Sequence, residues 1–306
     1  MQRASTIVAL AIVNACSVEA TPAIRRPHTP YPTLEPDGRI GAVPIDPYGP
    51  EPVLAMRGLV GDHVPSDVEF GDPSTVTKMV VKVKSAYRLP STPNHRVAVD
   101  HDIQRVTIHV GPGTPVTRAE SVDALRSTAM IDANEPSIRR SAHQATSGLR
   151  TDRQRVAALV SWTHSYMTYE HADVTVASTV LARGRGDCSE FSLLFVALAR
   201  ATGIPARRVV GLAATEIDLA SAFGFHAWAE VALDGHWVQV DPTWNEPVAD
   251  ATHLVLVEGD GDEWSKAVDD LHVAVVDLEH DKTFGRRADA RQLTRELPAY
   301  LRLRRR

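Results

Sequence analysis

The chain has 306 residues, of which 43% are hydrophobic and 23% are charged, and its net charge is -5. This length and composition are ordinary for a globular protein that forms one large domain or two modest ones. The binding of phosphate needs a basic surface, so the negative charge excludes nucleic acid as a main partner. We interpret the basic run at the C-terminus, Arg302 to Arg306, as a solvated tail.

Residues 1–15 have the pattern of a secretory signal peptide. One positive charge, at Arg3, precedes an apolar stretch that is too short to cross a bilayer as a helix. The segment ending at Cys16 resembles a bacterial lipobox, although Asn14 is not favoured there. We therefore expect an exported bacterial protein, periplasmic or attached to the cell envelope, with Cys16 as a candidate lipidation site. A plain cleaved signal peptide, or a misplaced start followed by a buried strand, is the alternative.

Residues 16–52 are rich in proline and predict an extended linker. The region that follows, residues 53–120, is expected to be β-rich. Apolar and polar residues alternate there, which predicts a half-exposed strand over Val76 to Leu89 and a second strand over Arg105 to Val110. The sequence leaves open whether this region is a separate domain or an edge of the main one.

Residues 121–260 are predicted to form an α+β core, and residues 261–306 a C-terminal extension. Amphipathic helices are expected over Pro136 to Thr146 and over Asp152 to Tyr166, and a third helix over Cys188 to Thr202. Short strands follow at 207–213, 226–233, 236–241, 252–257 and 272–278. Helices followed by consecutive short strands indicate an antiparallel sheet.

Cys188 stands at the predicted N-terminus of the third helix. The thiolate is the nucleophilic form of cysteine, and the helix dipole and unpaired N–H groups at that end stabilise negative charge. The same N–H groups suit an oxyanion that forms during acyl transfer. Glycines 184 and 186, just before the cysteine, would let a substrate backbone come close. The alternative is a small buried hydrophobic residue, as most cysteines without a disulfide are.

His226 begins a predicted strand, and Asp234-Gly235 is the signal of a tight turn that joins this strand to the next one. Strand partners around this turn have residue numbers that sum to about 469, which makes Asp241 a diagonal neighbour of His226. A carboxylate there can fix the tautomer of the imidazole and stabilise its charged form. Each residue also has an ordinary explanation, a simple hydrogen bond for the histidine and a turn before Pro242 for the aspartate.

Three stretches resemble the bacterial transglutaminase-like superfamily, whose members share a papain-like core. These are GDCSEFSLLFVALARATGIPARRVVGL at 186–212, FHAWAEVALDGHWVQVDPTWNE at 225–246 and DATHLVLVEGD at 250–260. The resemblance implies a papain/transglutaminase-like core with the nucleophile helix packed on an antiparallel sheet, preceded by the small β-rich region. It also implies a catalytic triad of Cys188, His226 and Asp241.

The family includes protein crosslinkers, amide-hydrolysing proteases and peptide-modifying enzymes, and some members have lost activity. The resemblance therefore implies a cysteine protease, another hydrolase such as a deamidase, or an acyltransferase, acting on amide bonds of peptides or proteins. No cofactor is implied, and the calcium dependence of the animal enzymes is not carried over because Asp260-Gly261-Asp262 lacks the ligand spacing of an EF-hand. The substrate, the acyl acceptor and the oligomeric state stay open.

Two alternatives to an enzyme are kept. One is a membrane-anchored binding or scaffold protein that retains the fold without turnover. The other is a metal site of Cys188, His226 and His236, which is disfavoured because His236 lies past the turn and because zinc sites usually gather more sulfur or histidine ligands. No metal is predicted.

Trp228, Trp244 and Glu190 are weaker candidates for substrate binding. The two tryptophans would wall the cleft and exclude water, but packing in the core explains them equally well. An acidic residue in the first turn of a helix, as Glu190 is, also has the plainer explanation of stabilising the helix end.

Overall fold

The computed structural model describes residues 56–60, 63–170, 176–217, 220–259, 268 and 270–284. The predicted signal peptide with Cys16, the proline-rich linker and the basic tail lie outside the described residues. Within these described ranges, no helix is long and apolar enough to cross a membrane.

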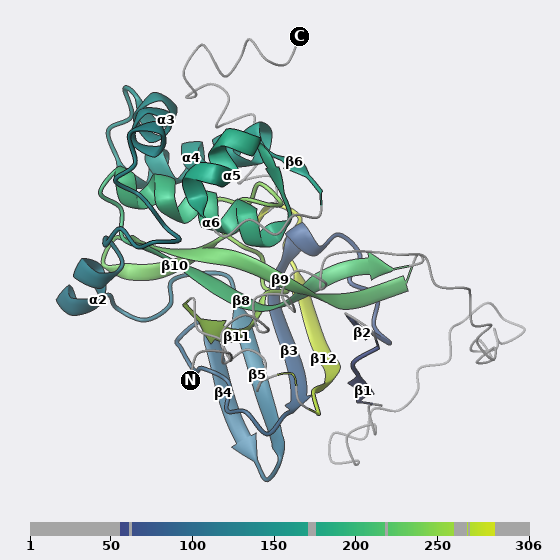
Figure 1. Cartoon of the computed structure of the whole chain (residues 1–306). Helices are drawn as coiled ribbons and strands as arrows, with labels where there is room; N and C mark the ends of the chain where they lie inside the picture. The colour runs from purple at the N-terminus through teal and green to yellow at the C-terminus, as the bar shows by residue number, and fades with distance from the viewer. Residues whose placement is uncertain are drawn as a thin grey trace, which may run out of the picture.

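The described chain forms two main antiparallel sheets, with helices covering one face of the second sheet (Figure 1). The strands are β1 Arg57–Gly58, β2 His63–Pro65, β3 Val76–Lys84, β4 His95–Asp100, β5 Ile103–His109, β6 Thr168–Tyr169, β7 Arg185–Gly186, β8 Ala206–Ile217, β9 Ala220–Leu233, β10 His236–Val240, β11 Leu254–Glu258 and β12 His272–His280. The first sheet has the order β1-β12-β3-β5-β4, and the second has the order β10-β9-β8-β11 with β2 also paired to β9. This confirms the predicted α+β fold class with an antiparallel sheet.

The helices are α2 Arg118–Asp123, α3 Pro136–Thr146, α4 Asp152–Tyr166, α5 Ala177–Arg183 and α6 Cys188–Ala201, with a 3-10 turn at Pro73–Thr75. The predicted bounds of α3 and α4 are confirmed. Proline at the first position of α3 needs no hydrogen-bond partner for its nitrogen. Thr151 caps α4 through a reciprocal capping box with Gln154. Gly203, with φ 79°, follows α6 and ends it as predicted.

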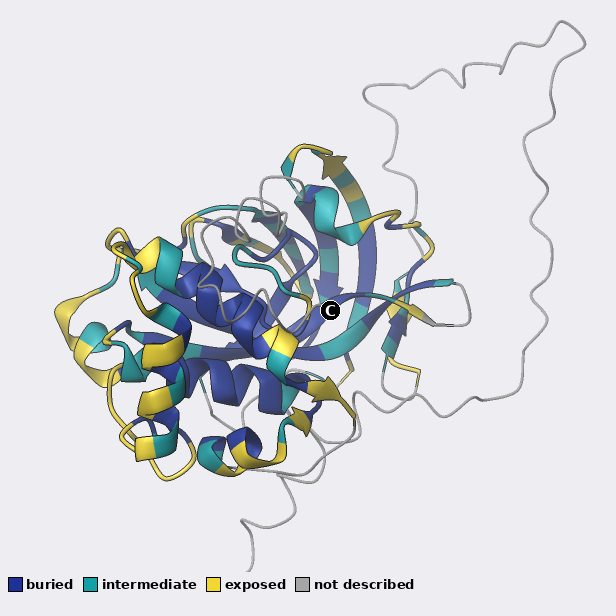
Figure 2. Ribbon diagram, turned by 90° about the horizontal axis from the view of Figure 1, so that it is seen from above, coloured by how far each residue is buried: buried dark blue, intermediate teal, exposed yellow. Residues whose placement is uncertain are grey.

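Two hydrophobic cores join the layers. The first lies between the helices and one face of the second sheet, and it includes Leu194 and Val231. Helix α6 is its centre, because every side chain from Glu190 to Ala199 is buried, and Figure 2 shows the buried residues gathered in the middle of the molecule. The second core lies between the two sheets and includes Val81 of β3 and Leu212 of β8. Helix α6, which carries the predicted nucleophile, is therefore fixed by packing along most of its length.

Strand β9 is longer than the sequence predicted. The predicted strand began at His226, but β9 begins at Ala220. Residues 221–224 pair with β8 on one edge, and residues 222–224 pair with β2 on the other. Strand β10 pairs with the far end of the same edge, at residues 229–233. Among the described strands, none pairs with residues 225–228 on that edge, and the loop after β10 occupies this region.

The C-terminal extension contributes a strand to the N-terminal region. Strand β12 lies between β1 and β3 in the first sheet. Strand β3 shows the predicted alternation, with Met79, Val81 and Val83 buried. The first sheet is thus built from both ends of the described chain, and it packs against the second sheet rather than standing apart.

Candidate active site

Strands β9 and β10 form the hairpin predicted from Asp234-Gly235. These two residues have φ values of 51° and 80°, the left-handed conformation that two-residue hairpin turns require. His236 pairs with Leu233, and Val240 with Ala229, so the predicted register is confirmed. This register brings Asp241, the residue after β10, to the edge of β9 near His226.

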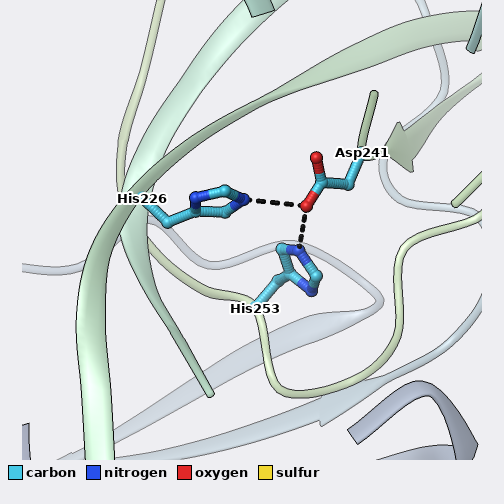
Figure 3. Close-up of side chains that lie close together, drawn as sticks. All are labelled: His226, Asp241 and His253. Atoms are coloured by element: carbon cyan, nitrogen blue, oxygen red, sulfur yellow. Dashed lines mark hydrogen bonds and ion pairs between the residues drawn. The ribbon is translucent and has the colours of Figure 1, made fainter. Parts of the chain in front are cut away.

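The carboxylate of Asp241 is bonded at both oxygens. Nε2 of His226 lies 2.8 Å from Oδ2 (Figure 3). Oδ1 accepts hydrogen bonds from the backbone N–H groups of Thr243, at 2.7 Å, and Trp244, at 3.4 Å. The loop is closed by a backbone bridge between Asp241 and Glu246. The structure therefore brings the predicted base and its orienting residue together, and their catalytic roles stay a prediction.

A second histidine, His253, bonds the same oxygen of Asp241. Its Nε2 lies 3.3 Å from Oδ2 of Asp241 (Figure 3). Its Nδ1 lies 3.1 Å from the backbone oxygen of Asp250. The side chain is fully buried just before β11. We did not assign His253 a role from the sequence. Its occurrence in the DATHLVLVEGD stretch, with an aspartate three residues before it, was the available signal.

Burial and charge act in opposite directions on this cluster. Burial favours the neutral form of Asp241, but the nearby His226 and the hydrogen bonds from His226 and His253 outweigh it, so the pKa of Asp241 is lowered. Burial likewise disfavours the charged form of His253. The contacts with Asp241 and Asp250 and the charge of Glu246 outweigh this effect and raise the pKa of His253 well above its ordinary value. These contacts therefore favour the anionic form of Asp241 and the cationic form of His253.

Cys188 is the first residue of α6 and is buried, with 3% of its surface exposed. Helix α6 packs against β9, the strand that carries His226. Cys188 also belongs to the same hydrophobic cluster as Ala227, the residue after His226. The predicted nucleophile thus lies at the N-terminus of α6, the helix that packs against β9.

The start of α6 is closed by its own side chains. The Asp187 side chain accepts the N–H groups of Ser189 and Glu190, and the Glu190 carboxylate accepts the N–H of Asp187 at 2.9 Å. The N–H groups of Ser189 and Glu190 therefore serve the cap, and the binding of an oxyanion at this helix end stays a prediction. Glu190 is 2% exposed and its carboxylate stabilises the helix end, whereas its contact with a substrate stays a prediction.

Gly186 makes room for this cap. A Cβ atom on Gly186 would lie 2.3 Å from Cβ of Glu190, closer than two carbon atoms can approach. Gly186 therefore has a structural reason inside the helix cap, and the approach of a substrate backbone to it stays a prediction. Gly184, with φ 65°, ends α5 in the left-handed conformation.

The two candidate tryptophans lie in different environments. Trp228 is fully buried against Val209 and Val255, and its Nε1 donates to Oε1 of Gln239 at 3.2 Å. Trp244 is 37% exposed, and its ring stacks on His226 with centroids 4.3 Å apart. Of the two, Trp244 has an exposed surface beside His226, and its contact with a substrate stays a prediction.

Two groups of described residues have donor atoms close enough to share a metal ion, within 4.8 Å of one another. One group is His226, Asp241 and His253, and the other is Glu246, Asp250 and His253. The ring nitrogens of His253 already bond Asp241 and Asp250, so hydrogen bonds explain its position without an ion. His236, suggested for a metal site, pairs with Leu233 at the opposite end of β10 from Asp241.

Residues 139–242 match the family model of the transglutaminase-like superfamily. Similar solved structures include a proposed cysteine protease from Cytophaga hutchinsonii, at 14% identity and a TM-score of 0.42 over 67% of this chain and 86% of that one. The periplasmic domain of TgpA from Pseudomonas aeruginosa is 16% identical, with a TM-score of 0.40, over 63% of this chain and 82% of that one. Red sea bream transglutaminase is 10% identical, with a TM-score of 0.32, over 59% of this chain and 47% of that one.

No curated protein matches the chain significantly. The family assignment rests on the family model, because the similarities to solved structures are weak. The matched segment contains the nucleophile helix and the whole β9–β10 hairpin, and it ends one residue after Asp241. Residues 139–242 of this chain are thus similar to the core of the transglutaminase-like superfamily.

Proposed function

We propose that the protein is a cysteine enzyme that transfers acyl groups from amide bonds of peptides or proteins. The observation that carries the proposal is the buried hydrogen bond between His226 and Asp241, on a strand that packs against the helix opened by Cys188. A nucleophile, a base and a residue that orients the base are the parts that nucleophilic catalysis needs.

In the first half-reaction, Sγ of Cys188 attacks the carbonyl carbon of the substrate amide, and His226 takes the thiol proton. Asp241 bonds Nε2 of His226, so Nδ1 is the nitrogen that exchanges this proton. When the tetrahedral intermediate collapses, the C–N bond breaks and His226 gives the proton to the leaving amine. The product is a thioester on Cys188 and a free amine.

The ion pair with His226 is the main stabilisation that we assign to the thiolate. The helix dipole favours a negative charge at Cys188. However, two carboxylates, Asp187 and Glu190, already occupy the N-terminal turn of α6. These carboxylates take up part of the stabilisation that the helix dipole offers, and they repel a further negative charge at Cys188. A positive imidazolium beside the sulfur is therefore required for a reactive thiolate near neutral pH.

In the second half-reaction, water or an amine attacks the thioester carbon and gives its proton to His226. The C–S bond breaks, and the proton returns to the sulfur of Cys188. Water makes the protein a cysteine peptidase or a deamidase, and an amine makes it a crosslinking or conjugating enzyme. Stacking of Trp244 over His226 supports a site partly screened from water.

We also propose that the enzyme acts outside the cytoplasm, in the periplasm or at the cell envelope. The support is the signal-peptide pattern of residues 1–15 and the proline-rich segment after it. Lipidation of Cys16 would add attachment to the membrane. The substrate in this location would be a peptide or protein of the cell envelope.

Trapping of the acyl-enzyme tests the proposed reaction. The full chain with Cys16→Ser is mixed with p-nitrophenyl acetate, quenched in acid and weighed by mass spectrometry. We expect one acetyl group on Cys188, and adding a primary amine should show whether the thioester passes to the amine or to water. Cys188→Ala should remain unmodified, and His226→Ala should acylate at least about tenfold more slowly. Equal acylation of the wild type and the His226 variant would overturn the proposal.

A further inference from the structure

A row of buried polar side chains continues past the His226–Asp241 pair into the loop before β11. It runs from His226 through Asp241 to His253 and ends at Asp250. All four side chains are at least nine-tenths buried. The triad mechanism uses only the first two, so the remaining two are buried titratable groups without an assigned role.

His253 is held between two carboxylates. Nε2 lies 3.3 Å from Oδ2 of Asp241, and Nδ1 lies 3.4 Å from Oδ1 of Asp250. Asp250 is itself fixed, because its Oδ1 accepts from the N–H and the hydroxyl of Thr252 at 2.7 Å and 2.6 Å. The imidazole of His253 therefore has one orientation, and this orientation directs its Nε2 at the oxygen that His226 also uses.

We propose that His253 is a positioning residue, which anchors Asp241 from the side opposite His226 and supplies a fixed positive charge to the site. This inference rests on the proposed function of Cys188 and His226. Oδ1 of Asp241 is held by backbone N–H groups, and His253 holds Oδ2. The carboxylate then cannot turn away from His226 when the imidazole ring moves or changes its charge.

The charges of the neighbouring groups are consistent with a cationic His253. The groups around it are Asp241, Asp250, Glu246 and His226, and the ring of His95 accepts the N–H of Val255 nearby. Burial and the charge of Asp250 raise the pKa of Glu246 well above its ordinary value, which favours its neutral form. Asp241 and Asp250 are the carboxylates in direct contact with the His253 ring.

This arrangement predicts the effect of removing the positive charge. The ring centroids of His226 and His253 are 5.9 Å apart, so the cation disfavours a second cation at His226 and favours a thiolate at Cys188. Without the positive charge of His253, the Cys188 thiol and the His226 imidazolium should both lose their protons at higher pH. Both steps in the pH dependence of Cys188 reactivity should therefore move upward by about one to two pH units.

The experiment measures the rate of Cys188 alkylation by iodoacetamide from pH 4 to pH 10 in the full chain with Cys16→Ser. His253→Gln removes the charge and keeps a donor for Asp241, so we expect the shifted profile with a maximal rate close to that of the wild type. His253→Leu removes the donor as well, and its maximal rate should fall about tenfold or more. Circular dichroism melting curves verify that each variant is folded.

His236→Gln is the matched control, because it makes the same chemical change at the far end of the hairpin, where Nδ1 of His236 contacts the backbone oxygen of Asp234. Its profile should superimpose on that of the wild type. A His253→Gln profile that superimposes on the wild type would overturn the fixed positive charge, and an unchanged maximal rate in His253→Leu would overturn the positioning role. Both results would leave the proposed function intact. A wild type without enhanced reactivity would instead overturn the proposed function. In that case, a neutral His253 in histidine-labelled NMR spectra at pH 7 would overturn the inference separately.

Discussion

The indole ring of Trp244 lies parallel to the imidazole ring of His226, with their planes 9° apart and their centroids 4.3 Å apart. Trp244 is held there because its backbone N–H bonds Oδ1 of Asp241 and because the loop closes through the Asp241–Glu246 bridge. Asp241 thus contacts the imidazole of His226 and also positions the indole ring of Trp244, which stacks on that imidazole. Trp244 is in contact with solvent on its outer side, so it separates the His226–Asp241 hydrogen bond from water.

Trp244→Ala should strongly lower the rate of Cys188 alkylation and have only a small effect on the free energy of unfolding. Water would reach the His226–Asp241 bond and weaken it, and we expect the alkylation rate at pH 6 to fall about tenfold. Trp228→Ala is the comparison, because this fully buried ring should cost about 3 to 5 kcal/mol of the free energy of unfolding. Urea unfolding and alkylation rates measured on both variants separate the two roles. A larger loss of stability at Trp244 than at Trp228 would contradict the assignment.

The parts of the fold that local patterns encode were predictable from the sequence. The apolar stripe and the end signals of α3 and α4 lie within each helix, and the register of the β9–β10 hairpin follows from one turn. Pairing between distant segments is not visible in such patterns. The insertion of β12 between β1 and β3 and the pairing of β2 with β9 therefore required the structure.

In the candidate site, too, contacts within one local hairpin were predictable, and contacts between distant segments were not. His226 and Asp241 are linked by a local hairpin, which allowed their contact to be anticipated. His253 reaches Asp241 only because β11 pairs with β8, and β8 in turn pairs with β9. Glu190 was open to two explanations because a first-turn carboxylate has the same sequence pattern whether it caps the helix or faces a ligand.

Variants of Glu190 distinguish these two explanations. Glu190→Gln keeps an acceptor for the N–H of Asp187, and glutamine is a regular member of the capping box, so stability and reactivity should stay close to the wild type. Glu190→Ala leaves this buried N–H without its partner and should lower the free energy of unfolding by about 1 to 2 kcal/mol. Urea unfolding measures both changes. A stable Glu190→Gln variant that has lost acylation would show that the charge contacts the substrate after all.

His95 makes the protein sensitive to acid between the two sheets. Its Nδ1 donates to the backbone oxygen of Pro90 at 2.8 Å, and its Nε2 accepts from the N–H of Val255 at 3.2 Å, which requires the neutral ring. Burial lowers the pKa of His95 from 6.5 to about 4, although the bond to Pro90 offsets part of this effect. The unfolded chain therefore binds the proton more readily than the folded chain between these two pH values.

Stability should accordingly be full above pH 6.5 and fall as the pH drops toward 4. The loss from this single group amounts to about 3 kcal/mol, with no further contribution at lower pH. Urea unfolding at several pH values measures this slope, and His95→Gln should flatten it. His143→Gln is the control, because His143 is an exposed residue of α3 and its replacement should leave the slope unchanged. An unaltered slope in His95→Gln would contradict the assignment.

The most direct test of the central claim compares Cys188 alkylation with and without its base. The full chain with Cys16→Ser contains Cys188 as its only thiol, so the reaction with iodoacetamide has one source. We predict that the wild type reacts rapidly well below the ordinary thiol pKa of about 8.5, and that His226→Ala reacts only in the ordinary range. Slow reaction of both proteins, with the same ordinary profile, would contradict the existence of a thiolate–imidazolium pair and with it the proposed catalysis.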